Sequence, residues 1–206
     1  MKNLIIVGAG GFGREIFDWV QATGAYKIKG FLDDRPQALE GFNISAPVLG
    51  AIEGYEPNLE DVFIVALGDG KKRVMIMNRL MQKGGKMVSL IHTSAYVSTK
   101  AKLSDGCIIF PGCYIAAFSQ IGAGVVLNFN ASVGHDALIG DGCTLNSHVD
   151  VTGNVTLGKN VVMGSHSVVL PGLSIVDEVV IGAGSVVLRS IREKSTVMGV
   201  PAKRIF

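Results

Sequence analysis

The sequence predicts a two-part fold, in which a small parallel α/β domain is followed by a β-helix built from hexapeptide repeats. The first part has an apolar segment that runs into a glycine-rich turn, and then expected strands and helices in alternation up to residue 90. The second part has an aliphatic residue at every sixth position. We therefore expect an α/β domain over residues 1–90, a β-helix over 91–188 and a tail over 189–206 that packs on the β-helix.

The first domain begins with the segment "NLIIVGAGGFGRE", which satisfies the pattern G-x-G-x-x-G at Gly8, Gly10 and Gly13 directly after an apolar run. "FLDD" places Asp33 and Asp34 about 20 residues further on, where a dinucleotide-binding fold holds an acidic ribose ligand. These features predict a Rossmann-like domain, and taken alone they leave a dehydrogenase possible. We expect strands at 3–8, 27–32, 62–67 and 86–91, and helices near 11–22 and 71–83.

The second domain is predicted by a period of six, which matches neither the helical period of 3.6 nor strand alternation. Each hexapeptide forms one short strand and a corner, and three of them close a triangular coil, which gives about six coils. The repeat is unbroken, so substrate recognition is expected from residues 1–90. Gly122, Gly140, Gly158 and Gly182 are expected at tight corners. The inward positions are Ile91, Val97, Leu103, Ile109, Ile115, Ile121, Leu127, Val133, Ile139, Leu145, Val151, Leu157, Met163, Val169, Ile175, Ile181 and Val187.

Composition and register exclude several classes of function. A formal net charge of +2 with no clustered basic face argues against nucleic acid as a partner. No apolar run approaches the roughly 20 residues of a membrane span, and we expect a cytoplasmic protein without membrane insertion. Cys107, Cys113 and Cys143 share the small inward position of the repeat, so we interpret them as core residues and not as disulfides or metal ligands.

Four histidines are candidates for chemistry. His135 is followed at once by Asp136, and a carboxylate beside an imidazole can orient a general base and stabilise its protonated form. His148 and His166 are 18 residues apart and should stack on successive coils, where they could be structural, line a ligand cleft or, with His135 across a subunit boundary, bind zinc. His92 lies at the junction of the two domains, where a structural role is expected.

Several motifs in order carry a resemblance that covers nearly the whole chain: "GAGGFGRE", "FLDD", "ALGDGKKR", "VGHDALIGDG", "VVLPGLSI", "VIGAGSVV" and "GVPAK". Together they resemble the NeuD/PglD-like sugar O-/N-acyltransferase family, whose fold is a Rossmann-like domain followed by a left-handed parallel β-helix. The resemblance implies acetyl-CoA as co-substrate, no metal, a nucleotide-linked sugar as partner and a homotrimer. It implies catalytic His135 and Asp136, substrate-binding Gly10, Gly11, Phe12, Asp33, Asp34, Gly68 and Asp69, and acetyl-CoA-binding Thr144, Gly153, Ser165, Ala183 and Lys203, with Arg204 as an alternative to Lys203.

The activity that this resemblance implies is acetyl transfer to a nucleotide-activated amino sugar, at the 4-amino group of a 4-amino-4,6-dideoxyhexose, in surface polysaccharide or glycan biosynthesis. O-acetylation of a sialic-acid-like sugar or another small hydroxyl acceptor, and a non-catalytic nucleotide-sugar-binding trimer, are the alternatives. Phe12 stands where many relatives have a histidine near the acceptor, and Thr144 where some have a histidine near the donor. The nucleotide and the sugar are therefore left open.

Overall fold

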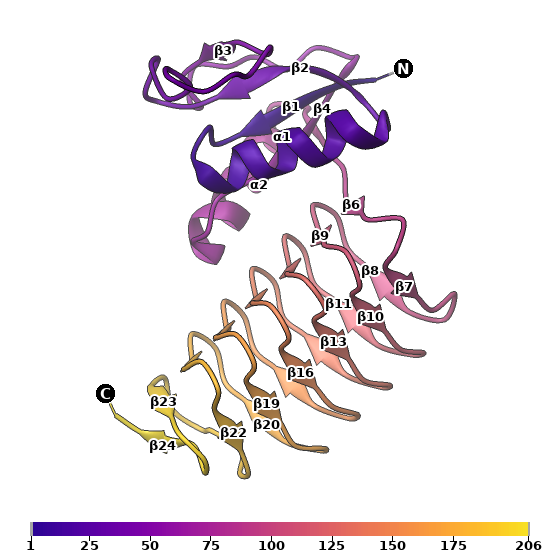
Figure 1. Cartoon of the computed structure of the whole chain (residues 1–206), viewed down its shortest axis with the longest axis vertical. Helices are drawn as coiled ribbons and strands as arrows, with labels where there is room; N and C mark the ends of the chain where they lie inside the picture. Colours follow the sequence, from indigo (N-terminus) through magenta and orange to yellow (C-terminus); the bar gives the residue numbers. More distant parts are fainter. Residues whose placement is uncertain (1, 206) are drawn as a thin grey trace. The chain divides into compact units, whose positions relative to one another are not determined.

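The structure, a computed structural model, describes residues 2–205 and divides into two compact units, one up to Val88 and the other from Ser89 onward (Figure 1). The first unit is an α/β domain and the second is a parallel β-helix. Within the described residues no helix is long and apolar enough to cross a membrane.

The α/β unit is a five-stranded parallel sheet in the order β3-β2-β1-β4-β5. The chain runs outward from β1 to β3 and then returns to the other side of β1 with β4, so the order reverses between β1 and β4. In such sheets ligands bind beyond the carboxyl ends of the strands at this reversal. The elements are β1 (Asn3–Val7), α1 (Gly11–Thr23), β2 (Lys27–Leu32), β3 (Val48–Gly50), β4 (Asp61–Val65), α2 (Gly70–Gln82) and β5 (Lys86–Met87).

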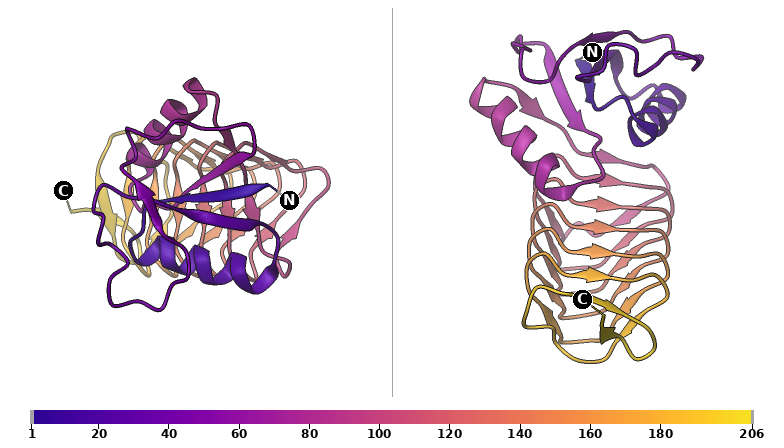
Figure 2. Two further views of the ribbon diagram at one scale, coloured as in Figure 1. Left: turned by 90° about the horizontal axis from the view of Figure 1, so that it is seen from above. Right: turned by 90° about the vertical axis from the view of Figure 1, so that its left-hand side faces the viewer.

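Packing of the α/β unit follows from its two crossover helices. Right-handed β–α–β connections that proceed in opposite directions from the centre of the sheet place α1 and α2 on opposite faces, as Figure 2 shows. The central strands β1 and β4 are buried along nearly their whole length, which matches their continuous apolar sequences. On the α1 side, Phe17 packs on Phe31 of β2 with ring centroids 5.7 Å apart.

The predicted elements of this unit are confirmed with two differences. The strand β3 was not expected, because only three residues after Pro47 pair with β2 and they lie within a turn-rich segment. The expected strand at 86–91 is two strands, since β5 joins the α/β sheet whereas β6 (Leu90–Ile91) begins the β-helix. The two are separated by only two residues, which an apolar pattern cannot resolve.

The β-helix has three faces, each a sheet whose parallel neighbours are 18 residues apart, such as Tyr114 and Ser132. The first face is formed by β7 (Tyr96–Val97), β10 (Tyr114–Ile115), β13 (Ser132–Val133), β16 (Asp150–Val151), β19 (Val168–Val169) and β22 (Val186–Val187). The second face is formed by β8 (Lys102–Leu103), β11 (Gln120–Ile121), β14 (Leu138–Ile139), β17 (Thr156–Leu157) and β20 (Ser174–Ile175).

The third face carries the end of the chain. It is formed by β6, β9 (Ile108–Ile109), β12 (Val126–Leu127), β15 (Thr144–Leu145), β18 (Val162–Met163), β21 (Val180–Ile181), β23 (Thr196–Met198) and β24 (Lys203–Arg204). The strand β23 continues the parallel ladder on β21, and β24 then turns back antiparallel to β23. The C-terminal segment is thereby hydrogen-bonded to the last coil.

The predicted inward column is confirmed from Ile109 to Val187, where each of its residues is at most 3% exposed. Its first three positions differ: Ile91 is 45% exposed, and Val97 and Leu103 are half-buried. These positions belong to the first coil, which has a neighbouring coil on one side only. The regular period therefore predicts which side chains point inward, but not how deeply they are buried at the end of the β-helix.

The corners follow a second rule that the sequence analysis did not find. Every sixth residue from Gly106 to Gly184 has a positive φ, and at these positions glycine, asparagine, aspartate and histidine predominate, the residue types that tolerate this region best. The glycines expected at the corners, such as Gly122 and Gly140, are not among them. They are needed for a different reason, since a Cβ on Gly140 would lie 2.5 Å from the backbone of Gly158 in the next coil.

Candidate active site

The pair of His135 and Asp136 lies at the corner that joins the first face to the second, between β13 and β14. Asp136 occupies the left-handed corner position with φ 59°, and its N–H donates to the carbonyl of Ala117 in the preceding coil at 3.2 Å. The carbonyl of His135 accepts from the N–H of Asn154 in the following coil at 2.9 Å. The backbone of the pair is thus fixed from both sides, while the side chains are 64% and 49% exposed.

The side chains of this pair are bonded to each other. Nδ1 of His135 lies 2.8 Å from Oδ2 of Asp136, so the carboxylate assigns the ring proton to Nδ1. Nε2 is then the unprotonated nitrogen, which is the arrangement that a general base requires. The predicted partnership of His135 and Asp136 is present as a hydrogen bond.

Gly153 lies directly against the imidazole. A Cβ at this position would be 2.6 Å from Nε2 of His135, so only glycine leaves room for the ring. Its own carbonyl accepts from Gly172 at 3.1 Å, whereas among residues 2–205 its N–H has no acceptor. A free backbone N–H beside Nε2 is the kind of donor that stabilises a developing oxyanion.

The other residues expected at the acetyl-CoA site lie away from His135 within one chain. Ser165 lies between β18 and β19, and Ala183 between β21 and β22, so both occupy the corner that joins the third face to the first. Thr144 is in β15 on the third face, and the exposed Lys203 is in β24. Of the predicted donor residues, the structure brings Gly153 alone to the corner of His135.

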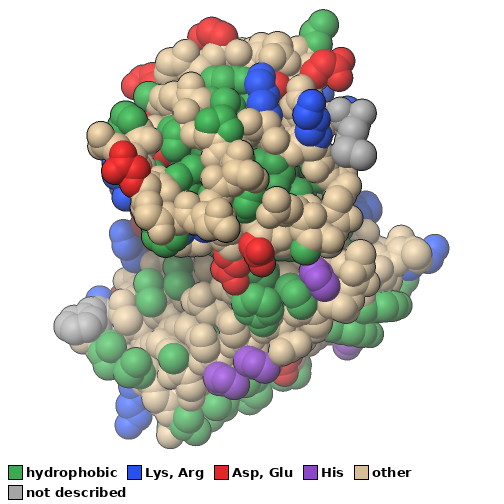
Figure 3. Space-filling model, turned by 45° about the horizontal axis from the view of Figure 1, so that its top comes forward, with side chains coloured by type: hydrophobic (Ala, Val, Ile, Leu, Met, Phe, Trp, Pro, Cys, Tyr) green, Lys and Arg blue, Asp and Glu red, His purple; other side chains and the backbone are tan. Residues whose placement is uncertain are grey.

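His148 and His166 stack as the sequence predicts. Their rings are parallel within 5° and their centroids are 4.6 Å apart, at the same corner as Ser165. Histidine side chains are visible on the surface in the space-filling view (Figure 3). In parallel rings the nitrogen lone pairs also run parallel and do not converge on one ion. Within the described residues no three His, Cys, Asp or Glu side chains are grouped to hold a metal.

The remaining histidine and the cysteines have structural settings. Nδ1 of His92 lies 2.8 Å from the hydroxyl of Ser94 and accepts from the Ser94 N–H, which stabilises the turn after β6. Cys107, Cys113 and Cys143 are buried, as predicted for core residues. Burial raises the pKa of the Cys113 thiol to about 11, so this thiol is not an activated nucleophile.

The glycine turn of the α/β unit leads directly into α1. Gly10 is the N-cap and supplies no side-chain hydrogen bond. Gly11 begins the helix and is exposed, and the next residue, Phe12, is half-buried. Gly13 is obligatory, because a Cβ there would lie 1.8 Å from the carbonyl oxygen of Gly8. The N-cap glycine has no side chain that could bond the first helical N–H groups, a setting that suits an anion.

Asp33 and Asp34 have different environments. Asp33 is buried, and its carboxylate accepts from the Ala9 N–H at 2.8 Å and from the Arg35 guanidinium at 3.0 and 3.1 Å. Burial alone would raise its pKa, but the hydrogen bonds from Arg35 and Ala9 outweigh burial and lower that pKa. Asp33 thus ties the glycine turn to the end of β2, and Asp34 is the exposed carboxylate.

A pocket of about 530 Å³ opens beside Asp34. Its size falls in the range of small-molecule sites. Oδ1 of Asp34 accepts from the N–H of Ile52 at 3.1 Å, which holds the segment after β3 against the end of β2. The lining residues are Asp34, Ala51, Ile52, Glu53, Met75, Ile76, Arg79, Leu80, Gln82 and Lys83.

The loop after β4 is built on a buried arginine. Asp69 is the N-cap of α2, and its Oδ1 accepts from the Lys72 N–H at 3.1 Å, while Gly68 is exposed. Arg73 is 0% exposed and donates to the carbonyl of Leu67 beneath the loop. Arg73 was not predicted as a site residue, although it belongs to the "ALGDGKKR" motif and lies one helical turn after Asp69.

Arg14 is a further residue that the sequence patterns do not single out. Its guanidinium donates to the carbonyl of Ala9 at 3.2 Å and lies 3.7 Å from the centre of the Phe42 ring. It therefore brings a positive charge to the glycine turn at the start of α1. The signal in the sequence is its place in the first turn of a predicted helix. A basic residue there interacts unfavourably with the helix dipole, so its presence points to a role other than helix stability.

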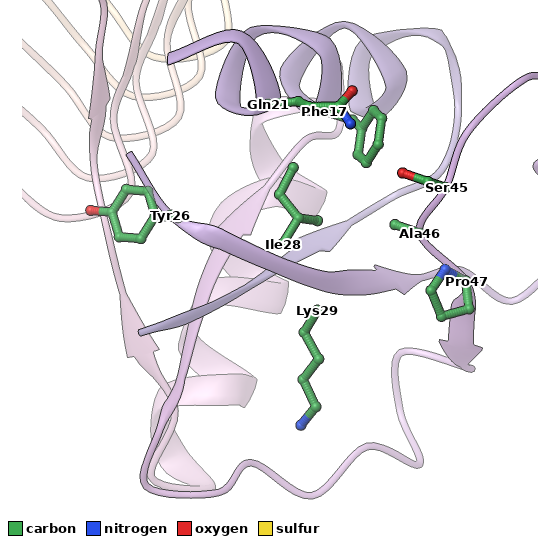
Figure 4. A pocket seen from close by; sticks show the side chains of 8 residues that line it. All are labelled: Phe17, Gln21, Tyr26, Ile28, Lys29, Ser45, Ala46 and Pro47. Carbon is green, nitrogen blue, oxygen red and sulfur yellow. The ribbon is translucent and has the colours of Figure 1, made fainter. Parts of the chain in front are cut away.

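A second pocket of the α/β unit, of about 370 Å³, lies around β2 near its amino end (Figure 4). Phe17 and Ile28 line it on one side of the strand, and Lys29 extends to the other side. Lys29 is paired with the buried Asp61 at 2.9 Å and with the hydroxyl of Tyr55 at 2.8 Å. This pocket is remote from the carboxyl edge of the sheet, where nucleotides bind in this topology.

Comparison with known proteins gives related sequences and structures for both units. Residues 3–80 match the PglD N-terminal domain family. A UDP-N-acetylbacillosamine N-acetyltransferase of Bacillus subtilis is 32% identical over 111 residues, or 53% of this chain, and the match spans about half of that relative's length (51%).

Solved structures match over the whole chain. The acetyltransferase domain of PglB from Neisseria gonorrhoeae has a TM-score of 0.91 at 30% identity and covers 100% of both chains. Its complex with acetyl coenzyme A has a TM-score of 0.91 at 29% identity and covers 99% of each. A histidine-to-asparagine mutant of perosamine N-acetyltransferase from Caulobacter crescentus, in complex with CoA and GDP-perosamine, has a TM-score of 0.91 at 28% identity and covers 99% of this chain and 97% of that one.

Proposed function

The chain belongs to the NeuD/PglD-like family of sugar acyltransferases with a left-handed β-helix, and from this premise we propose that it transfers an acetyl group from acetyl-CoA to a nucleotide-linked amino sugar. The observation that carries the proposal is the 2.8 Å contact of His135 with Asp136, with Nε2 facing the backbone of Gly153. The relatives named as N-acetyltransferases, and their complexes with acetyl-CoA and GDP-perosamine, support the same reaction.

The proposed reaction is a direct transfer. The sugar amine attacks the thioester carbonyl, and Nε2 of His135 accepts the proton that the amine loses as the N–C bond forms. Asp136 stabilises the imidazolium that results, and the Gly153 N–H donates to the oxyanion. When the C–S bond breaks, the imidazolium returns the proton to the CoA sulfur, so that amide and free CoA thiol are the products. No cysteine takes part.

The α/β unit is proposed to bind the nucleotide sugar. The N–H of Gly11 at the start of α1, where the N-cap Gly10 has no side chain to bond it, suits the diphosphate, with Phe12 next to it and the guanidinium of Arg14 nearby. The pocket beside Asp34 suits the base or ribose. Asp33 is less suited to that role, because both of its carboxylate oxygens already accept hydrogen bonds from Ala9 and Arg35. The exposed Gly68 and Asp69 lie after β4, next to the reversal of strand order, where the sugar is proposed to bind.

The donor site is proposed to require a second subunit. Ser165 and Ala183 are at one corner of the β-helix and His135 is at another. An acetyl-CoA molecule that contacts both sets must lie between two chains, which a closed homotrimer provides. Thr144 and Lys203 are the remaining proposed donor contacts. Mixing His135→Ala subunits with Ala183→Trp subunits tests this, because each mixed trimer would contain an intact site, whereas sites within one chain would stay inactive in the mixture.

The acceptor is proposed to be a 4-amino-4,6-dideoxyhexose of surface polysaccharide or glycan biosynthesis. Two relatives support an amino-sugar acceptor, since one is named as a UDP-N-acetylbacillosamine N-acetyltransferase and the other is a perosamine N-acetyltransferase in complex with GDP-perosamine. We also propose a cytoplasmic location, with which three buried cysteines in the thiol form agree, since disulfides are rare in that compartment.

The test is release of free CoA thiol from acetyl-CoA with a panel of UDP-, dTDP- and GDP-linked 4-amino sugars and simple hydroxyl acceptors. We expect amine-dependent release that falls by about 10² or more in His135→Ala, while the matched control His92→Asn keeps wild-type turnover. Release with hydroxyl acceptors alone would establish O-acetylation instead. Binding of nucleotide sugar with no release from any acceptor would contradict the transferase and support the non-catalytic nucleotide-sugar-binding alternative.

A further inference from the structure

Phe118 has a backbone conformation that disfavours its own side chain. Its φ is 62° and the residue is 61% exposed. The other left-handed corners are mostly glycine, asparagine, aspartate or histidine, with Glu178 as the one other exception in the described part of the chain. A bulky L-residue is strained in this region, and an exposed ring gains little from burial in return. The fold would be served better by glycine or asparagine at this position.

The position of Phe118 suggests what the strain serves. It occupies the corner between β10 and β11, one coil before the equivalent corner of Asp136, and coils of a parallel ladder are about 4.8 Å apart. The adjoining Ala117 carbonyl accepts the Asp136 N–H. Gly153, in contrast, lies one coil after His135. The corner of the catalytic pair therefore has Phe118 at the equivalent corner one coil before it and Gly153 one coil after it.

This order separates acceptor from donor along the β-helix axis. The proposed donor contacts, including Gly153, Ser165 and Ala183, all lie toward the last coil relative to His135. The side toward the first coil is left for the acceptor, and there the chain presents the exposed Phe118. Sugars have an apolar face formed by their C–H groups, and a deoxy position enlarges it by a methyl group. An exposed aromatic ring beside the reacting groups matches that surface.

We propose that Phe118 is a specificity-determining residue that packs on the apolar, deoxy face of the acceptor sugar while His135 accepts the proton of its amine. This inference rests on the proposed function and adds to it the chemical feature by which the acceptor is selected. Strain at an exposed side chain next to reacting groups is a recurrent property of ligand-contacting residues. One buried methyl group corresponds to about a fourfold preference in kcat/KM, and rejection of a hydroxyl in its place increases that preference.

The test compares Phe118→Asn with wild type on paired 6-deoxy and 6-hydroxy 4-amino nucleotide sugars. Asparagine accepts the left-handed conformation, so Tm should stay the same or rise by about 2–4 °C. We expect KM for the acceptor to rise about tenfold, KM for acetyl-CoA to remain unchanged, and the preference for the 6-deoxy sugar to disappear. Phe118→Leu should keep part of the preference.

A matched control is Glu178→Asn, which relieves the same backbone strain at a different corner, where Glu178 pairs with the surface Lys194. It should leave both KM values and the sugar preference unchanged. Wild-type turnover with unaltered selectivity in Phe118→Asn would overturn this inference and leave the proposed function standing. Loss of the oligomer in Phe118→Asn, seen by light scattering, would show a subunit contact and also overturn it. Absence of turnover by wild type with every acceptor would instead overturn the proposed function.

Discussion

A methyl group added at Gly153 should disable the site without unfolding the protein. In Gly153→Ala the new Cβ would lie 2.6, 2.8 and 3.1 Å from Nε2, Cε1 and Cδ2 of His135. Ordinary contact begins near 3.4 Å, so the ring must move by about 0.8 Å. The imidazole is exposed and free to rotate away, and Gly153 has no positive φ that would strain an alanine.

The magnitude follows from what that movement disrupts. Rotation of the ring breaks the 2.8 Å bond to Asp136 and carries Nε2 away from the attacking amine. A displacement of about 1 Å at a reacting group lowers the rate by about 10²-fold. The lost hydrogen bond is exposed, so the free energy of unfolding should change by less than about 1 kcal/mol. We therefore expect kcat to fall about 10²-fold while Tm shifts by no more than about 2–4 °C.

A double-mutant cycle distinguishes this mechanism from a general defect. Steady-state CoA release is measured for wild type, Gly153→Ala, His135→Ala and the double variant. If the added methyl group acts through the imidazole, the double variant should be no slower than His135→Ala, because the group it displaces is already absent. The reasoning is refuted if Gly153→Ala retains wild-type kcat, or if the two effects multiply. Gly54→Ala is the control, since a Cβ there meets nothing within 4 Å.

Three further predictions concern other named contacts. Asp136→Asn should lower kcat about 10²-fold with little change in acceptor KM, since the amide does not hold the imidazolium, and steady-state kinetics measures both. Asp33→Asn should reduce the free energy of unfolding by about 1–2 kcal/mol at pH 7. Because the pKa of Asp33 is lowered in the folded protein, this contribution is present above the ordinary pKa of 3.8 and is lost as the pH falls below it. The Tm values of wild type and Asp33→Asn, measured by thermal melts, should therefore differ at pH 7 and converge at pH 3. Cys113 should resist iodoacetamide at pH 8 in the folded protein, as mass spectrometry would show, because burial raises its thiol pKa to about 11.

The β-helix could be predicted from the sequence because each coil repeats the same physical requirement. An aliphatic side chain such as Ile115 or Val133 must point inward at every sixth position, and a continuous column results. Ile91 shows where this reasoning ends, since burial depends on a coil on each side and a period carries no information about the end of the stack. The left-handed corners were missed because glycine shares them with asparagine, aspartate and histidine, so no single letter marks them.

The roles of residues in the α/β unit were harder to predict, because adjacent residues of the same type differ only in their surroundings in the folded structure. Asp33 and Asp34 are both acidic and adjacent, yet Asp33 is enclosed by Ala9 and Arg35 while Asp34 borders a pocket. The distinction depends on contacts between segments 24 residues apart. Arg73 is a similar case, since a charged helix residue is expected at the surface and only the fold reveals that it supports the loop after β4.

The β-helix offers an internal comparison that most folds lack. Equivalent corners share one backbone conformation, so the residues at one corner of successive coils differ for reasons other than the path of the chain. Ahead of the left-handed position, the corner of the candidate site carries Ala117, His135, Gly153 and Pro171 in turn. The histidine would collide with any side chain at the position after it, and the glycine there removes that collision. Since the repeat can be continued with alanine or proline, the pairing of an imidazole with a glycine is not required by the fold, and it supports the proposed reaction at this corner.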